Sequence, residues 1–271
     1  MRTLKYRQKD NPLSMRSSLF AASLGLFCLA AFAAAPAAFG AGTIYFAEDL
    51  NHAGDTVRVT PTNSLAKRDQ FLAALTGAVT DTLETQTAGS AQPWTLAFGR
   101  LTGTGPNTVM VSLPSPTGTI DGRFPFSGSI FFQQADEYEP VRYSATLALT
   151  TAQRAFGFLV SDWGDAGPLD GTRPTVRVTY LDNTTETFVA PASILGTDIS
   201  GSAAFFGLTT DQAFQSVEII NGTGSRTAGY DDFTVASQLV PVAAPEPGSM
   251  AFFLLGLGAG AGLVRRRGTN V

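Results

Sequence analysis

Cysteine, histidine and lysine are nearly absent from this 271-residue chain, and each scarcity excludes a kind of chemistry. The only cysteine, Cys28, lies inside an apolar N-terminal run, and the only histidine is His52. Neither a phosphate-binding Gly-rich loop nor a GxSxG nucleophile motif is present. Disulfide stabilisation and most nucleophile-based catalysis are therefore not expected, and His52, in the loop-like stretch DLNHAGD, is interpreted as a solvated residue.

The scarcity of lysine leaves the middle of the chain strongly acidic. Between Gly42 and Ala244 there are 20 Asp and Glu residues but only 10 Lys and Arg, and Lys67 is the single lysine. A domain with this excess of negative charge gains nothing from counterion release at phosphates, so nucleic acid is not an expected partner. An acidic, lysine-poor and threonine-rich composition suits an extracellular setting that is rich in polysaccharide.

Residues 1–41 have the layout of a secretory signal peptide. A basic, polar start is followed by an apolar run over 19–35, and small residues then offer cleavage after Ala37 or Gly40. The long basic region also allows translation to begin at Met15. The alternative is an uncleaved membrane anchor. Because Phe27 rather than a small residue precedes Cys28, we reject lipid attachment at this cysteine.

The middle of the chain, residues 42–236, reads as an all-β domain. Stretches such as DTVRVTP, NTVMVSLP and QSVEIING alternate branched or aromatic residues with polar ones, which is typical of half-buried strands. Asp182 and Asn183 supply turn chemistry for a hairpin between strands at 176–180 and 186–189. Further strands are predicted at 43–46, 79–84, 94–98, 130–133, 143–149, 156–161, 204–208, 217–221 and 233–236. Many short strands with loops between them predict a two-sheet sandwich of jelly-roll type.

Two phenylalanine-rich stretches indicate how the core is filled. Phe156 and Phe158 fall on one face of a strand, as do Phe206 and Leu208, whereas Phe205 points to the opposite face. We interpret these as paired core strands.

One segment departs from the strand pattern. The stretch NSLAKRDQFLAALTG predicts a short helix over 66–75 that covers one end of the sandwich, with Asn63 or Ser64 as its N-cap and Gly77 at its end. A proline-rich linker is expected over 237–249.

Carboxylate chemistry is the one catalytic possibility that the composition leaves open. A glycosidase needs two carboxyl groups facing each other across a cleft. Nothing in the spacing selects a pair, so we expect a protein that is not an enzyme and keep a secreted glycan hydrolase as the alternative. Trp163 could stack on a sugar ring through its apolar face. The candidate carboxylates are Glu137, Glu139, Asp162, Asp165 and Asp170.

The C-terminal 27 residues have three parts in a fixed order. Pro245, Glu246 and Pro247 form a stiff, extended segment, because proline fixes its own φ and disfavours helix in the residue before it. An uncharged, glycine-rich run over 250–264 then spans about 22 Å as a helix, short of a roughly 30 Å hydrocarbon core. Three arginines follow it, as the positive-inside rule requires of a cytoplasmic end: Arg265, Arg266 and Arg267.

This order closely resembles the PEP-CTERM sorting signal: a Pro-Glu-Pro motif, a hydrophobic span and a terminal basic cluster. The resemblance covers only about 25 residues, yet the order and terminal position are specific. It implies an exported protein that is recognised by exosortase, a membrane cysteine transpeptidase that cuts near the motif. The product is then released or attached at the cell surface in bacteria that make extracellular polysaccharide. The signal is an address and carries no activity of its own.

Two stretches of the middle domain resemble the first and last strands of carbohydrate-binding jelly-roll modules. They are VTDTLETQTAG and GYDDFTVA. In those modules an early glutamate and an aspartate before the final strand share a structural calcium. The resemblance therefore implies a Ca²⁺ site at Glu84 with Asp231 or Asp232. The alternative is that Asp231 and Asp232 form a turn and cap local backbone groups.

Overall fold

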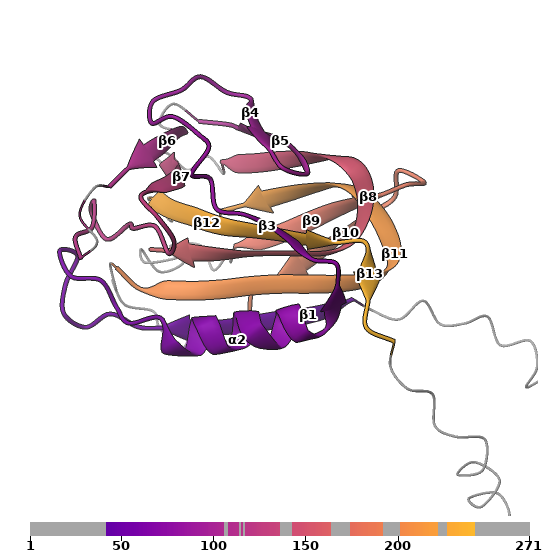
Figure 1. Cartoon of the computed structure of the whole chain (residues 1–271), viewed down its shortest axis with the longest axis horizontal. Coiled ribbons are helices and arrows are strands. Elements are labelled where there is room, and N and C mark those ends of the chain that lie inside the picture. The colour runs from indigo at the N-terminus through magenta and orange to yellow at the C-terminus, as the bar shows by residue number, and fades with distance from the viewer. Residues whose placement is uncertain are drawn as a thin grey trace, which may run out of the picture. The chain divides into compact units, whose positions relative to one another are not determined.

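The structure, a computed structural model, describes residues 42–105, 108–113, 115, 117–135, 143–163, 174–191, 201–221 and 227–241. This part of the chain is mostly β-strand with one helix (Figure 1), so the predicted all-β sandwich is confirmed. Both hydrophobic terminal segments lie outside the described residues. The elements are β1 (Thr43–Asp49), α2 (Thr62–Ala73), β2 (Leu75–Thr76), β3 (Val79–Asp81), β4 (Trp94–Leu96), β5 (Gly99–Gly103), β6 (Val109–Ser112), β7 (Ile130–Ala135), β8 (Ser144–Ser161), β9 (Thr175–Tyr180), β10 (Thr185–Val189), β11 (Ala203–Ile220), β12 (Thr227–Ala236) and β13 (Gln238–Leu239).

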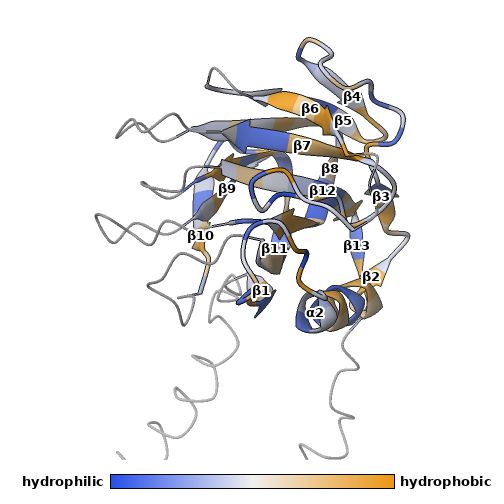
Figure 2. Ribbon diagram, turned by 90° about the vertical axis from the view of Figure 1, so that its left-hand side faces the viewer, coloured by the Kyte–Doolittle hydropathy of each residue, from blue (hydrophilic) through white to orange (hydrophobic). Residues whose placement is uncertain are grey.

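Two long strands, β8 and β11, join the layers of the sandwich. They pair antiparallel from Ala203 opposite Ser161 to Ile220 opposite Ser144, with register shifts between Thr209 and Ser216. At one end they are flanked by β5 and β9, and at the other end by β12 and β1. The 11-stranded sheet therefore divides into a first layer, β10-β9-β11-β8-β5-β4, and a second layer, β1-β11-β8-β12-β7-β6, with β3 also on β12 (Figures 1 and 2).

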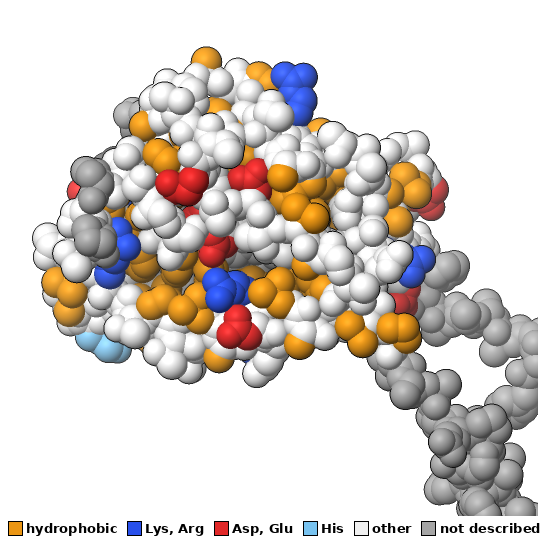
Figure 3. Space-filling model, viewed as in Figure 1, with side chains coloured by type: hydrophobic (Ala, Val, Ile, Leu, Met, Phe, Trp, Pro, Cys, Tyr) orange, Lys and Arg blue, Asp and Glu red, His pale blue; other side chains and the backbone are white. Residues whose placement is uncertain are grey.

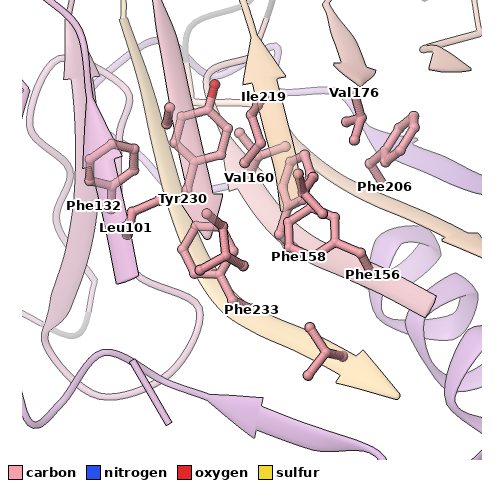
Figure 4. Packing of buried hydrophobic residues seen from close by; sticks show 14 of the residues in the cluster. Leu101, Phe132, Phe156, Phe158, Val160, Val176, Phe206, Ile219, Tyr230 and Phe233 are labelled. Carbon is pink, nitrogen blue, oxygen red and sulfur yellow. The ribbon is translucent and has the colours of Figure 1, made fainter. Parts of the chain in front are cut away.

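The main core lies between these layers. The predicted face assignment is confirmed, because Phe156, Phe158 and Phe206 are all fully buried in this one cluster. Phe206 lies opposite Phe158 in the register, with ring centroids 5.8 Å apart. Figure 4 shows these three residues among other buried members of the cluster, including Val160 and Ile219. Period-two alternation along the two strands therefore accounts for the core.

A β-bulge in β12 adapts that strand to the core. Asp231 lies opposite Leu159 and Thr234 opposite Gly157, so β12 has one extra residue here. Asp232 takes up this residue with a left-handed φ of 51°. As a result Tyr230 and Phe233, three residues apart, both face the main core (Figure 4).

The helix covers the outer face of the second layer. Phe71 is fully buried there against Leu159 and Phe205, in a cluster separate from the main core. Phe205 therefore points away from Phe206, as its position in the sequence predicts.

The predicted start and cap of the helix are wrong. The helix begins at Thr62, ahead of the predicted residue 66, so Asn63 and Ser64 are its early residues and neither is the N-cap. Instead the carboxylate of Asp49, at the end of β1, accepts hydrogen bonds from the backbone N–H groups of Asn63 and Ser64, both at 2.8 Å, and from Ser64 Oγ at 2.7 Å. A negative side chain at a helix N-terminus satisfies free N–H groups and complements the helix dipole. The cap therefore comes from a residue distant in the sequence.

One predicted strand is absent and one predicted hairpin is confirmed. The segment 55–61, DTVRVTP, forms no strand, although its pattern alternates. Its Arg58 instead reaches neighbouring loops, donating to the carbonyl groups of Gly118 at 2.6 Å and Ser115 at 3.0 Å. The hairpin between β9 and β10 turns at Asp182 and at Asn183, whose φ is 66°.

The described domain begins and ends at the same rim of the second layer, that is, at the same end of its strands. Thr43 of β1, Thr209 of β11, Ala155 of β8 and Ala236 of β12 occupy one row across four neighbouring strands. The folded chain then extends past the predicted boundary at 236, because β13 pairs with β2 and Val240 N donates to Ala74 O at 2.9 Å.

Candidate functional site

Three carboxylates predicted from the sequence converge on one stretch of backbone, residues 124–130, which we call the 124–130 segment. This segment connects to β7 and carries no strand of its own before Ile130. Ser161, at the end of β8, fixes its first residue, since its Oγ lies 3.0 Å from both the N and the O atoms of Phe124. The segment is therefore held by side chains from β8, from β12 and from the turn after β3.

Glu84 holds the C-terminal part of the 124–130 segment. Its Oε1 accepts hydrogen bonds from Ser129 N at 2.8 Å and Ile130 N at 2.7 Å. Gly128 has a left-handed φ of 55°, and a Cβ there would lie 2.2 Å from Glu84 Cδ. Glycine at 128 is thus required both by the backbone conformation and by the approach of the carboxylate.

Asp231 and Asp232 hold the middle of the same segment. Oδ2 of Asp231 accepts from Phe126 N at 2.7 Å and Ser127 N at 2.9 Å. Oδ1 of Asp232 accepts from Ser127 Oγ at 2.5 Å, and its Oδ2 lies 3.5 Å from Nη1 of Arg68 on α2. The bulge in β12 therefore turns two consecutive carboxylates toward the 124–130 segment and the helix.

Burial dominates the electrostatics of Asp231. It raises the pKa of this fully buried carboxyl group well above the usual 3.8, and the neighbouring Asp232 raises the pKa further. Hydrogen bonds from the N–H groups of Ser127, Asp232 and Phe126 act in the opposite direction. The site thus holds a proton more tightly than an exposed aspartate does.

These contacts differ from the alternative in which Asp231 and Asp232 form a turn and cap local backbone groups, because both residues lie in β12 and the groups they cap belong to the distant residues Phe126 and Ser127. Among the described residues no group of three or more His, Cys, Asp or Glu is placed to hold a metal ion. Oxygen atoms of Glu84, Asp231 and Asp232 that a cation would use accept N–H and O–H donors. In this arrangement the carboxylates accept backbone and hydroxyl donors, and Ca²⁺ binding at these residues stays a prediction.

Of the five candidate carboxylates, Asp162 lies within the described residues, as does the histidine His52. Asp162 is buried, with a φ of 63°, and its Oδ1 accepts from Gly201 N at 2.9 Å. Its carboxylate therefore joins the end of β8 to the segment just before β11 and does not face solvent. His52 is exposed, as expected of a residue in a solvated loop. The other four candidate carboxylates lie outside the described residues: Glu137, Glu139, Asp165 and Asp170.

Trp163 packs against the main core. Its ring lies edge-on to Phe158, with centroids 5.5 Å apart, and to Phe206, at 5.9 Å. The side chain is half-buried and its indole nitrogen is shielded from solvent. Sugar stacking on Trp163 stays a prediction, and the contacts give this residue a role in packing.

Arg58 is a structural residue that the sequence pattern does not indicate. Its guanidinium lies 5.1 Å from the centroid of the Phe124 ring, which is a cation–π contact. It also donates a hydrogen bond to Pro125 O at 3.2 Å, so Arg58 contacts the first two residues of the 124–130 segment. Partial burial lowers the pKa of Arg58. In the sequence Arg58 is an arginine within an alternating stretch, a pattern that is equally typical of an exposed position on a strand.

The sorting residues and the basic cluster lie outside the described residues: Pro245, Glu246, Pro247, Arg265, Arg266 and Arg267. A search of the described residues finds no helix that combines the length and apolar character needed to span a membrane.

Comparison with known proteins gives structural likenesses alone. No protein-family profile matches the chain, and no curated protein matches its sequence. The K2 cleaved adhesin domain of Lys-gingipain is 14% identical over 60% of this chain and 99% of its own, with a TM-score of 0.37. The C-terminal family 22 carbohydrate-binding module of Clostridium thermocellum Xyn10B is 13% identical over 60% and 96%, with a TM-score of 0.32. The CBM22-1 xylan-binding domain of Paenibacillus barcinonensis Xyn10C is 14% identical over 53% and 87%, with a TM-score of 0.31. These values describe a distant likeness and say nothing about a ligand.

Proposed function

We propose that this protein is an exported, non-enzymatic β-sandwich protein of the cell surface or extracellular matrix that associates with polysaccharide. The observation that carries the proposal is the order of its C-terminal parts. The motif Pro245-Glu246-Pro247 is followed by the apolar span 250–264 and then by the cluster Arg265-Arg266-Arg267.

The place of the motif relative to the folded domain supports its use as a sorting signal. Near the end of the described domain Val240 N donates a hydrogen bond to Ala74 O, and the next residue, Pro241, is exposed. Pro245 follows only four residues later, so a membrane transpeptidase of the exosortase type could reach the motif without unfolding β13. The apolar span would insert in the membrane transiently during export, or permanently if the tail is kept.

The contacts of four carboxylates support the proposal that the protein is not an enzyme. Asp49 caps α2, Asp162 joins the end of β8 to Gly201, and Glu84 and Asp231 hold the 124–130 segment. Each of these acidic groups therefore has a role in the fold.

Composition supports the association with polysaccharide. The domain between Gly42 and Ala244 is acidic and has a single lysine, and threonine is frequent on its exposed strands. Such a surface offers hydroxyl groups to sugars while it discourages binding to nucleic acid.

The test is the intact mass of the protein recovered from its own cell envelope and medium. It compares wild type with a Glu246→Ala, Pro247→Ala variant and with Pro241→Ala, a control in the same linker. We expect the wild type and the control to lack residues 1–41 and the tail, and the double variant to keep the tail. A tail retained in all three proteins would make 250–271 a plain anchor, and the sorting proposal would fall.

A further inference from the structure

An open depression lies beside β4, in a part of the molecule that the sorting function does not use. Its volume is about 390 Å³, within the range of small-ligand sites. Two elements form its walls: the loop that follows β3, and the strand β4. The lining groups that could bind a ligand are the hydroxyls of Thr85, Thr87, Ser90 and Thr95 and the amide of Gln86.

Hydrogen bonds and packing fix the shape of this depression. Trp94 is buried, its ring lies edge-on to Phe132 at 5.4 Å, and its Nε1 donates to both the O and the Oγ atoms of Ser90 at 3.0 Å. Gln86 Nε2 donates to Thr95 O at 2.7 Å. Gly89 N donates to Met110 O on β6 at 2.8 Å. The walls are therefore held in place by the fold, which lowers the entropic cost of binding.

The depression is free of charge although the domain is strongly acidic. None of its lining residues is ionisable. The adjacent carboxylate of Glu84 is bonded to Ser129 and Ile130. In Figure 3 the surface over β4 and β5, at the top of the view, is mostly neither charged nor hydrophobic, with a basic group at its right-hand end. The surroundings therefore favour a neutral ligand that is rich in hydroxyl groups.

The outer face of the first layer carries further hydroxyl groups, which Arg100 and Ala148 separate from the depression. Residues directly opposite each other on neighbouring strands share a face. One row across this face, whose members are exposed or half-buried, ends at Thr95, a wall of the depression. Its six strands, spaced by roughly 4.8 Å, make the row about 24 Å long. The row consists of Thr185, Thr179, Ser216, Ala148, Arg100 and Thr95.

Charge on the neighbouring row is balanced within the protein. Arg177 and Glu218 form an ion pair, and Thr146 and Thr102 continue the row toward β5. The face thus carries hydroxyl-bearing side chains, the Arg177–Glu218 ion pair and the exposed Arg100 opposite Thr95.

We propose that the depression beside β4 binds a neutral, hydroxyl-rich polysaccharide, whose chain continues along the row that ends at Thr95. This inference rests on the proposed association with polysaccharide and assigns it a site. Side-chain hydroxyl and amide groups both donate and accept, so they match sugar hydroxyls. An acidic polysaccharide would be repelled by the excess of Asp and Glu in the domain.

The experiment is affinity electrophoresis of the full protein through gels that contain galactan, xylan or β-glucan, with alginate as the acidic comparison. The first variant is Thr87→Glu, which places a charge in the depression at an exposed position. The second is the milder pair Thr85→Ala, Thr87→Ala. The matched control is Thr43→Ala, an exposed threonine on β1 in the other layer. Thermal melts of all four proteins verify folding.

We expect the wild type and Thr43→Ala to be retarded by at least one neutral polysaccharide, and affinity to fall about tenfold or more in Thr87→Glu. The double alanine variant should show a smaller loss in the same direction. Retardation by a neutral polysaccharide that survives in both depression variants, or retardation by alginate alone, would overturn the assigned site and leave the polysaccharide association standing. No retardation of the wild type in any gel would overturn the association itself and the site with it.

Discussion

Gly157 of β8 and Gly207 of β11 lie directly opposite each other, and together they leave the hollow that the Phe71 ring fills. A Cβ at Gly157 would lie 2.9 Å from Phe71 Cε1, and one at Gly207 would lie 3.0 Å from Phe71 Cδ2. The pair thus fixes how closely α2 approaches the sheet.

Alanine at either glycine should destabilise the protein. Gly157→Ala or Gly207→Ala forces the Phe71 ring out of its position, at a cost of roughly 1–3 kcal/mol in the free energy of unfolding. Urea melts measure this loss. Gly118→Ala is the control, because a Cβ there meets nothing closer than 3.4 Å. Melts of the two variants that coincide with the control would contradict the packing role of the pair.

Removing the cap from β1 should weaken the helix. In Asp49→Ala, two backbone N–H groups and Ser64 Oγ lose their acceptor. We expect a loss of about 1–3 kcal/mol in the free energy of unfolding, since these hydrogen bonds are charge-assisted. Asp55→Ala, an exposed aspartate, is the comparison for chemical denaturation. Equal midpoints for both variants would show that Asp49 does not stabilise the helix.

The contribution of Asp231 to stability should decline as the pH rises. Its pKa in the folded protein is raised above 3.8 by burial, so the folded state binds a proton more tightly than the unfolded state. This contribution is complete below the unfolded pKa and is lost as the pH rises through the folded pKa. The difference in unfolding free energy between wild type and Asp231→Asn should therefore shrink from low to neutral pH.

Asp182 supplies a control of opposite sign for this pH dependence. Hydrogen bonds from Thr184 lower the pKa of this exposed carboxyl group, so its contribution is present above 3.8 and is lost as the pH falls. The difference between wild type and Asp182→Asn should grow with pH. Parallel curves for Asp231→Asn and Asp182→Asn would refute the assignment for Asp231.

Chelation should leave the melting temperature unchanged. Glu84 and Asp231 already accept hydrogen bonds from the 124–130 segment, so the fold does not depend on a cation to neutralise them. Melts with EDTA and with added Ca²⁺ test this expectation. A fall in Tm with EDTA that Ca²⁺ restores, and that Glu84→Gln removes, would establish the calcium site that the sequence predicts.

Alternation along the sequence predicts a strand correctly where one face of that strand is buried and neighbouring strands pair with it. The faces of Phe156, Phe158 and Phe205 follow directly from period two. The same rule predicts separate strands on either side of Thr150 and of Thr210, whereas β8 and β11 each continue as one bent strand. The bend depends on pairing between the two strands, and no local pattern reveals such pairing.

The candidate site shows the same division between local and distant causes. The consecutive aspartates at 231 and 232 are visible in the sequence, and local capping was one of their two interpretations. Their partners Phe126 and Ser127 are about a hundred residues away in the chain, so the segment they hold could not be predicted. The cap from Asp49 and the depression beside Thr95 depend on tertiary contacts in the same way.

The shared row of Thr43 and Ala236 also determines how the domain can be attached. Three gaps between neighbouring strands separate these residues, about 14 Å. A tether at the beginning or at the end of the domain would therefore hold it by the same rim. The opposite rim, where Asp49, Ala203, Ser161 and Gly229 form the corresponding row, would project outward in either case. Cleavage at one terminus would change how firmly the domain is held and leave its exposed side the same.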